Sequence, residues 1–217
     1  LSPSVILFGE WNHFVLVVVG TFVLHMSTFW VHCALLTFID LNNTSLPSLL
    51  QWKVQPKDNI PLSSARLMVA VRQALFNQFV VNTSFAVFTY PLFRQFCSIS
   101  AHALPHPEQF LFELLCFIVL EEIGFYYGHR ALHHPSIYRY IHKQHHEFIA
   151  PISIAAIYAH PIEHILSNLA PIIAGPLLLR CHLVSYWLWL TIAVFSTITS
   201  HSGYHFPFLP SPEFHDF

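Results

Sequence analysis

Residues 14–39 read FVLVVVGTFVLHMSTFWVHCALLTFI, a run of 26 residues without a charged side chain. A transmembrane helix needs about 20 mostly apolar residues, so this run is long enough to cross a bilayer. The run shows no alternation of apolar and polar residues and is too long for a strand. It therefore predicts a membrane-spanning α-helix.

Four further apolar runs follow along the chain. They cover residues 73–93, 110–127, 165–179 and 183–200. Only residues 180–182 separate the last two runs, and two prolines and a glycine interrupt the shorter of them. We therefore expect this pair to form a tight hairpin that dips into the membrane. The five runs together predict an all-α integral membrane protein with about four transmembrane helices.

The composition excludes several classes of protein. Of the 217 residues, 54% are hydrophobic and 9% are charged, whereas a soluble domain carries about 25% charged residues. The chain is therefore neither disordered nor a typical soluble domain. Its net charge of −2 leaves no basic surface of the kind that binds nucleic acid, so we expect no nucleic-acid partner.

Basic residues indicate which side of the membrane each loop occupies. They concentrate between the first two apolar runs and after the third, at Lys53, Lys57, Arg66, Arg130, Arg139 and Lys143. Cytoplasmic loops carry an excess of Lys and Arg. The sequence therefore predicts that residues 40–70, 129–164 and 201–217 face the cytosol, where they form a helical cap.

The chain contains 17 histidines, almost twice its nine Lys and Arg residues. Clusters on the predicted cytosolic side are His129, His133 and His134; His142, His145 and His146; His201 and His205; and His215 near the printed end. Residues three or four apart share one helix face, so each box presents neighbouring imidazoles. Imidazole binds Zn, Cu, Fe and Ni, and this many imidazoles suit two ions better than one. The two adjacent histidines of the first cluster point about 100° apart on a helix, which leaves open which of them binds.

The sequence does not assign a single role to four residues near the clusters. Glu121 and Glu122 precede His129 by about two turns and are candidates for orienting a ligand imidazole through its second nitrogen; an unrelated helix contact is the alternative. His160 and His164 are four residues apart, and a place in a pocket wall or a turn is favoured over metal ligation.

These clusters and their flanking residues resemble the fatty acid hydroxylase/sterol desaturase superfamily, most of all the 4-methylsterol oxidases and the fatty acid hydroxylase domain-containing proteins. The resemblance lies in EEIGFYYGHRALHH at 121–134, YRYIHKQHHEF at 138–148, YAHPIE at 158–163 and HSGYHFP at 201–207. It covers residues 70–217, which we interpret as the family's domain. Residues 1–69 are interpreted as an N-terminal membrane helix and a cytosolic loop.

The resemblance implies a multi-pass enzyme of the endoplasmic reticulum membrane. Such enzymes use O2 and two iron ions, which zinc can replace in purified members, to oxidise a C–H bond of a sterol, fatty acyl chain or sphingolipid. Their electrons come from NAD(P)H through a reductase and a membrane haem protein. The family's last box is H-x-x-H-H, and the printed chain ends with His215-Asp-Phe. We therefore expect two further ligand histidines beyond Phe217 and an inactive, poorly metallated chain without them.

Two other classes of function fit part of the pattern. A histidine-rich metal transporter or storage protein would place polar groups along its spans, and the first two apolar runs carry few. A non-catalytic membrane scaffold derived from the enzyme is the other alternative. The residues favour the enzyme over the transporter because the histidine clusters lie outside the apolar runs.

Overall fold

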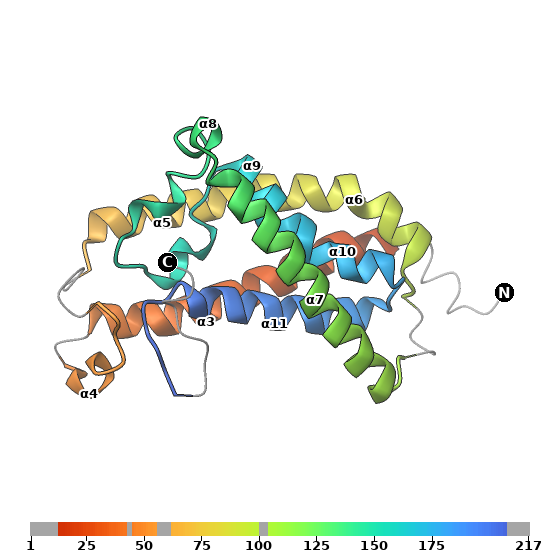
Figure 1. The fold of residues 1–217 in the computed structure, drawn as a ribbon. Helices are drawn as coiled ribbons and strands as arrows, with labels where there is room; N and C mark the ends of the chain where they lie inside the picture. Colours follow the sequence, from red (N-terminus) through yellow and green to blue (C-terminus); the bar gives the residue numbers. More distant parts are fainter. Residues whose placement is uncertain (1–12, 43–44, 56–61, 100–103, 208–217) are drawn as a thin grey trace.

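The computed structural model describes residues 13–42, 45–55, 62–99 and 104–207. Within these residues the chain is helical, with two isolated β-bridges and no strand, which confirms the predicted all-α class (Figure 1). In chain order the elements are η1 (Val15–Gly20), α3 (Thr21–Leu41), α4 (Pro47–Leu50), α5 (Ser64–Phe76), η2 (Asn77–Asn82), α6 (Thr83–Phe96), α7 (Pro107–Leu132), α8 (Pro135–Tyr138), η3 (His145–Glu147), η4 (Ser153–Ile157), α9 (Pro161–Glu163), η5 (His164–Leu169), α10 (Ala170–Leu178) and α11 (Leu183–Ser200).

Several of these elements join into long helices through π-helical turns. η1 continues into α3, and α5, η2 and α6 form one helix over residues 64–96, which begins earlier than the apolar run at 73–93 predicts. α9, η5 and α10 are continuous in the same way. The three π-helical turns η1, η2 and η5 are each six residues long. Single π-helical turns of this kind often occur at functional sites.

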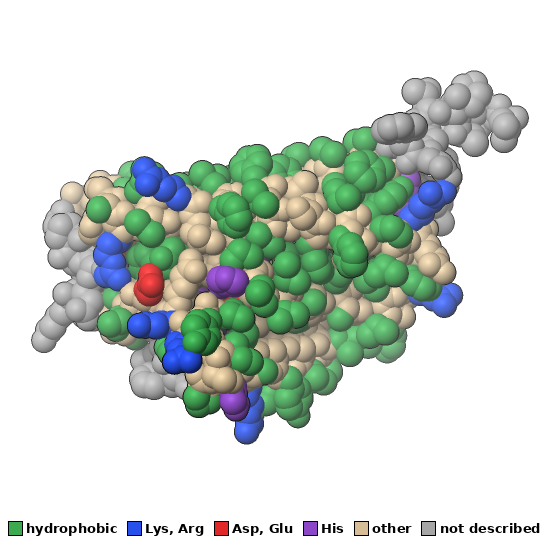
Figure 2. Space-filling view, turned by 90° about the horizontal axis from the view of Figure 1, so that it is seen from above, with side chains coloured by type: hydrophobic (Ala, Val, Ile, Leu, Met, Phe, Trp, Pro, Cys, Tyr) green, Lys and Arg blue, Asp and Glu red, His purple; other side chains and the backbone are tan. Residues whose placement is uncertain are grey.

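The outer surface of the bundle is apolar. Among the described residues, two helices are long and apolar enough to cross a membrane, Val15–Leu41 and Leu183–Ser200, and only 17% of an apolar 18-residue stretch of the first is buried in the protein. Its outward side chains include Val31 and Leu35, each 63% exposed. On the face drawn in Figure 2, hydrophobic side chains cover much of the centre, and most visible Lys and Arg side chains lie toward one end. An apolar surface of this extent is typical of a membrane contact.

Helix α7 crosses the bundle obliquely and packs against α10 (Figure 1). Two glycines of α7, Gly124 and Gly128, lie four residues apart and therefore on one face. A Cβ atom at Gly124 would lie 3.1 Å from Cβ of Pro171, and one at Gly128 would lie 3.3 Å from Oγ of Ser167. Small residues at this spacing let two helix backbones approach closely. This contact brings the last turns of α7, which carry the first histidines, next to η5.

The segment between α7 and α9 forms a cap at one end of the bundle. It contains α8, η3 and the 3-10 helix η4, whose five residues are all buried and which packs against α5 and α11. In Figure 1, α8 is the part of this segment that lies farthest from the bundle. The cap therefore rests on the ends of helices from both halves of the chain.

A buried polar cluster ties the chain after α11 to the same end. Asp40, in the last turn of α3, accepts hydrogen bonds from the ammonium of Lys53 and, at 2.8 Å, from the hydroxyl of Tyr204. Burial and the negative charge of Asp40 raise the pKa of Tyr204 above its usual value, so this hydroxyl remains a donor at neutral pH. The cluster holds in place the residues that directly follow His201.

The close approach of α7 and α10 gives a prediction about stability. Replacing Gly124 with Leu forces a side chain into Pro171, and overpacking of this kind costs about 1–3 kcal/mol. We therefore expect Gly124→Leu to lower the thermal unfolding midpoint, followed by helical circular dichroism in detergent. Val119→Leu is the matched control, because Val119 lies on the same helix and is 57% exposed. Equal unfolding midpoints for the two variants would contradict the close contact.

Candidate metal centre

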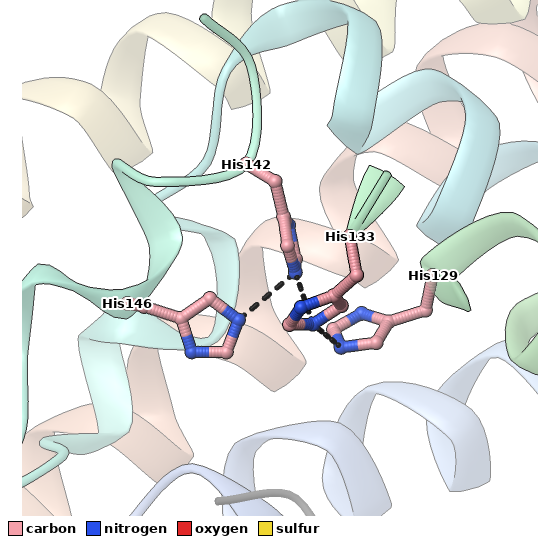
Figure 3. Close-up of side chains that lie close together, drawn as sticks. All are labelled: His129, His133, His142 and His146. Atoms are coloured by element: carbon pink, nitrogen blue, oxygen red, sulfur yellow. Dashed lines mark hydrogen bonds between the residues drawn. The ribbon is translucent and has the colours of Figure 1, made fainter. Parts of the chain in front are cut away.

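Four histidines converge in the cap at the end of α7 (Figure 3). The nearest ring nitrogens of His129, His133, His142 and His146 all lie within 4.8 Å of one another. The Nε2 atom of His133 lies 3.1 Å from Nε2 of His129 and 3.0 Å from Nε2 of His142, and Nε2 of His142 lies 2.9 Å from Nε2 of His146. We call these residues the four-histidine cluster.

The four imidazole rings come from two places in the chain, the C-terminal end of α7 and the loop that follows it. His129 lies in the last turn of α7, and His133 is the residue that caps its C-terminus. The chain then passes through α8 and returns, so that His142 follows a short turn and His146 lies in η3. The spacing of four at the end of α7 places the rings of His129 and His133 on the same side. His142 and His146 lie in a turn and a 3-10 helix, so the fold of the loop brings their rings together.

A buried carboxylate fixes the protonation of His142. Its Nδ1 lies 2.7 Å from Oε1 of Glu163, and both side chains are almost fully buried. A carboxylate accepts hydrogen bonds and does not donate them, so Nδ1 of His142 carries the proton. In the neutral ring, Nε2 then presents a lone pair to the other histidines, as metal ligands held by a carboxylate do.

Hydrogen bonds between the rings do not explain the positions of the Nε2 atoms in the cluster. The one in-plane lone pair on Nε2 of His142 faces the Nε2 atoms of both His133 and His146 at 3.0 and 2.9 Å. A neutral imidazole nitrogen of this kind accepts one hydrogen bond. Imidazole nitrogens that share one metal ion at about 2.0–2.1 Å lie about 3 Å apart. The geometry of the cluster therefore fits a bound transition-metal ion.

A second pair of histidines lies beside the cluster. Nε2 of His145 is 3.2 Å from Nε2 of His201 at the end of α11. Nδ1 of His201 faces the carbonyl oxygen of Thr197 at 2.7 Å, and Nδ1 of His145 faces that of Tyr158 at 3.4 Å. A carbonyl oxygen only accepts, so both Nδ1 atoms are donors and, in neutral rings, two Nε2 lone pairs point at each other. These two nitrogens are candidate ligands for a second cation.

Tyr158, the residue that directly follows η4, supports the second pair. Its hydroxyl donates a hydrogen bond of 2.8 Å to Oε2 of Glu147, which follows the second histidine cluster. Burial, together with the hydrogen bond and charge of Glu147, raises the pKa of Tyr158 to about 12. The hydroxyl therefore stays protonated at neutral pH and holds the loop whose carbonyl oxygen faces His145.

The remaining predicted site residues are placed elsewhere. His134 caps the N-terminus of α8 through its Nδ1, which accepts from the N–H of Ser136, so the structure turns His133 and not His134 toward the cluster. His160 caps α9 in the same way, through the N–H of Ile162. His205 is exposed. His215 lies outside the described residues.

Glu121 and Glu122 do not supply the carboxylate that contacts His142. They line a cavity inside the bundle instead, whereas the carboxylate that holds the imidazole is that of Glu163. The sequence signal for Glu163 was weak. It is an acidic residue beside an apolar run, two residues after Pro161, and its partner is 21 residues away.

The cavity connects the histidines with the apolar interior. It has a volume of about 520 Å³ and is lined by residues of α3, α6, α7, α10 and α11. His129, His145 and His201 form part of its wall, and aromatic and aliphatic side chains such as Phe29 and Leu190 form much of the rest. Pockets for small molecules have volumes of about 300–1,000 Å³ and are mostly apolar. An apolar molecule in this cavity would reach both groups of histidines.

Comparisons with known proteins agree with this arrangement. The fatty acid hydroxylase family matches residues 114–217. Fatty acid hydroxylase domain-containing protein 2 of Macaca fascicularis is 42% identical over 209 residues, 96% of this chain and 62% of that protein. Methylsterol monooxygenase 2-2 of Arabidopsis thaliana is 34% identical over 216 residues, 96% and 78% of the two chains.

A third relative is named for a different activity. Very-long-chain aldehyde decarbonylase GL1-11 of Oryza sativa subsp. indica is 35% identical over 225 residues, 96% of this chain and 79% of that protein. No solved structure matches the chain. The chain spans about 62% of the length of the first of these relatives.

The contact between Glu163 and His142 gives a prediction about metal affinity. Replacing Glu163 with Gln removes the negative charge that makes the imidazole a stronger ligand. We expect metal affinity to fall about 10- to 100-fold, as for other carboxylates that orient ligand histidines. Titration of purified full-length protein with Zn²⁺ against a chelator measures this. Glu108→Gln, at an exposed position in the first turn of α7, is the control, and equal affinities would refute the assigned role of Glu163.

Proposed function

Because the chain belongs to the fatty acid hydroxylase family, we propose that it is a membrane-bound di-iron enzyme that oxidises a C–H bond of a lipid. The observation that carries this proposal is the opening of one apolar cavity onto two groups of converging histidines. Bound iron would supply the activation of O2 and the oxidation of the C–H bond. The protein holds the ions, orients the lipid and keeps water away.

In this proposal the four-histidine cluster holds one iron ion, and His145 and His201 provide ligands for the other. All-nitrogen ligands of this kind suit iron as well as zinc. His205 and His215 remain candidate ligands for the second ion, since the described contacts account for two imidazoles there. Glu163 keeps His142 in the tautomer that presents Nε2.

The cavity supports a lipid substrate. Its apolar walls come from helices that carry exposed apolar side chains on their outer faces, such as α3 and α7. Binding in such a cavity keeps the hydrocarbon part of a lipid away from water, whose contact would cost about 25 cal/mol per Å² of apolar surface. Sterols, fatty acyl chains and sphingolipids all remain candidate substrates of this proposal.

The proposed reaction needs electrons from outside the chain. We propose that they come from NAD(P)H through a reductase and a membrane haem protein. Exposed basic residues at the end of α7 and in the cap, Arg130, Arg139 and Lys143, are close in sequence to the four-histidine cluster and offer a positive surface for such a carrier. We also propose about four membrane-spanning helices in the endoplasmic reticulum membrane, with the cap on the cytosolic side.

Metal content and product formation test the proposed reaction. Purified full-length protein should bind about two transition-metal ions, and His142→Ala and His201→Ala should each remove about one of them and abolish lipid oxidation. Product is measured by mass spectrometry after incubation with O2, NADPH, the reductase, the haem protein and a panel of sterols, fatty acids and sphingolipids. His134→Ala is the matched control, because His134 caps α8 and does not face the cluster. A folded protein without metal, or oxidised lipid formed by both ligand variants, would overturn the proposal.

Glycosylation tests the proposed sidedness. An N-x-[ST] acceptor inserted after Lys143 should remain unmodified because the cap faces the cytosol, and one inserted after Leu104, in the connection between α6 and α7, should be glycosylated. A shift in gel mobility relative to the chain without an insertion is the measurement. The reverse pattern would place the histidines on the lumenal side and refute the proposed topology.

A further inference from the structure

Two buried cysteines lie together at the end of the bundle away from the cap. α7 ends at the four-histidine cluster and α11 ends at His201, so the starts of both helices mark the opposite end (Figure 1). Cys97 directly follows α6 there, and Cys181 directly precedes His182, which caps the N-terminus of α11. The two cysteines are 8% and 1% exposed. We call them the cysteine pair.

A parallel β-bridge holds the two backbones side by side. It joins Ser98 to His182. The N–H of Ser98 donates to the carbonyl oxygen of Cys181 at 3.3 Å, and the N–H of Leu183 donates to that of Ser98 at 2.8 Å. Cys97 and Cys181 precede the two bridge partners, so their backbones are separated by about the spacing of adjacent strands, 4.7–4.9 Å. A disulfide requires Cα atoms about 4.4–6.8 Å apart, and the backbone therefore already suits one.

The side chains of the cysteine pair meet beside one carbonyl oxygen. Sγ of Cys97 lies 3.8 Å from the carbonyl oxygen of Pro176, and the backbone N–H of Cys181 donates to the same oxygen at 3.1 Å. The two thiols also form a hydrogen bond with each other. This hydrogen bond lowers the pKa of Cys97 and, together with burial, raises the pKa of Cys181. The two sulfur atoms are therefore in contact.

A metal ion does not account for the cysteine pair. A structural zinc site takes four protein ligands. In the part of the chain that the structure describes, the four-histidine cluster is the one group of three or more His, Cys, Asp or Glu side chains whose ligand atoms lie within 4.8 Å of one another. Two cysteines in contact, without a third ligand and on adjacent backbones, suit a covalent bond between them.

The proposed topology places the cysteine pair in an oxidising compartment. The cap faces the cytosol in that topology, so the opposite end of the bundle faces the lumen of the endoplasmic reticulum. Disulfides form and persist in that lumen, whereas the cytosol keeps thiols reduced. The side of the membrane therefore favours oxidation of two thiols that are already in contact.

We infer that Cys97 and Cys181 form a disulfide bond on the lumenal side of the protein. This inference goes beyond the proposed reaction and rests on the proposed sidedness. Each thiol gives up one proton and one electron as the Sγ–Sγ bond forms. A disulfide of the lumen accepts the two protons and two electrons, and its own S–S bond breaks to give two thiols. Because the cysteine pair is buried in the folded protein, the exchange takes place while the helices assemble.

The bond would tie together the helices that carry the candidate metal centre. It would close a loop of about 80 residues, and a disulfide restricts the unfolded chain more strongly when the loop is long. The loop contains α7, the cap and α10, and so includes the four-histidine cluster and Glu163. The disulfide would therefore stabilise this part of the bundle from the end opposite the metals.

The state of the thiols in cells tests the inference directly. Full-length protein in endoplasmic reticulum membranes is denatured in N-ethylmaleimide, reduced, and labelled with deuterated N-ethylmaleimide, and its peptides are identified by mass spectrometry. Cys97 and Cys181 should carry the second reagent, and an unreduced digest should contain their two peptides joined. Cys33 and Cys116 lie within α3 and α7 and should carry the first reagent, as internal controls.

Thermal unfolding of purified full-length protein measures what the bond contributes. Cys97→Ala and Cys181→Ala should each lower the unfolding midpoint by about 5–15 °C, and the double variant should lower it no further, because all three lose the same bond. Cys33→Ala is the matched control, since Cys33 is also buried, at 0% exposed, and should lower the midpoint less. The metal content of the cysteine-pair variants should be unchanged, so a failure of the proposed function is seen separately.

Reduced thiols at Cys97 and Cys181 in the cellular protein would overturn the inference. Pairing of either with another cysteine, or an equal shift of the midpoint for Cys33→Ala and the cysteine-pair variants, would also overturn it. The acceptor inserted after Leu104 is measured in parallel and separates two reasons for failure. Reduced thiols in a chain that is glycosylated there refute the disulfide itself, and reduced thiols in a chain that is not glycosylated refute the sidedness on which it rests.

Discussion

The hydrogen bond between His142 and Glu163 is the constraint on which the candidate site depends. Both side chains are buried, and the 2.7 Å contact joins the loop after α7 to the start of the helix formed by α9, η5 and α10. A buried carboxylate without a partner is unfavourable, so the loop and the helix are held together at this point. The same contact sets the tautomer of His142, on which convergence of the lone pairs depends.

Close helix packing makes this contact possible. Gly124 and Gly128 let α7 approach α10 and η5, so the helix end that carries His129 and His133 lies beside the segment that carries Glu163. A larger residue at either glycine would move the histidines away from the carboxylate. Packing inside the bundle and metal chemistry in the cap are therefore linked through one helix interface.

The cavity combines two properties that conflict in a membrane protein. Its walls are mostly apolar, as a lipid ligand requires, yet it contains buried polar groups that are costly there. The polar groups lie where two π-helical turns meet and next to the residue that orients His142. A second buried cluster, in which Asp40 binds Lys53 and Tyr204, fixes the chain that follows His201. Both groups of buried polar residues therefore lie next to the candidate metal centre.

The sequence by itself determined the helical class, the apolar surface and the family, because composition, run length and the spacing of three or four within a histidine box are local properties. It also pointed to the histidine boxes as metal ligands, but it did not separate His129, His133, His142 and His146 from the other candidate histidines. Only the tertiary structure decided that His133 and not His134 faces the cluster, that His145 pairs with His201, and that Glu163 orients His142. Those contacts join residues 56 and 21 positions apart, and the contact of His164 with Asn82 spans 82. Such pairings depend on how the helices pack, which the local pattern of residues does not encode.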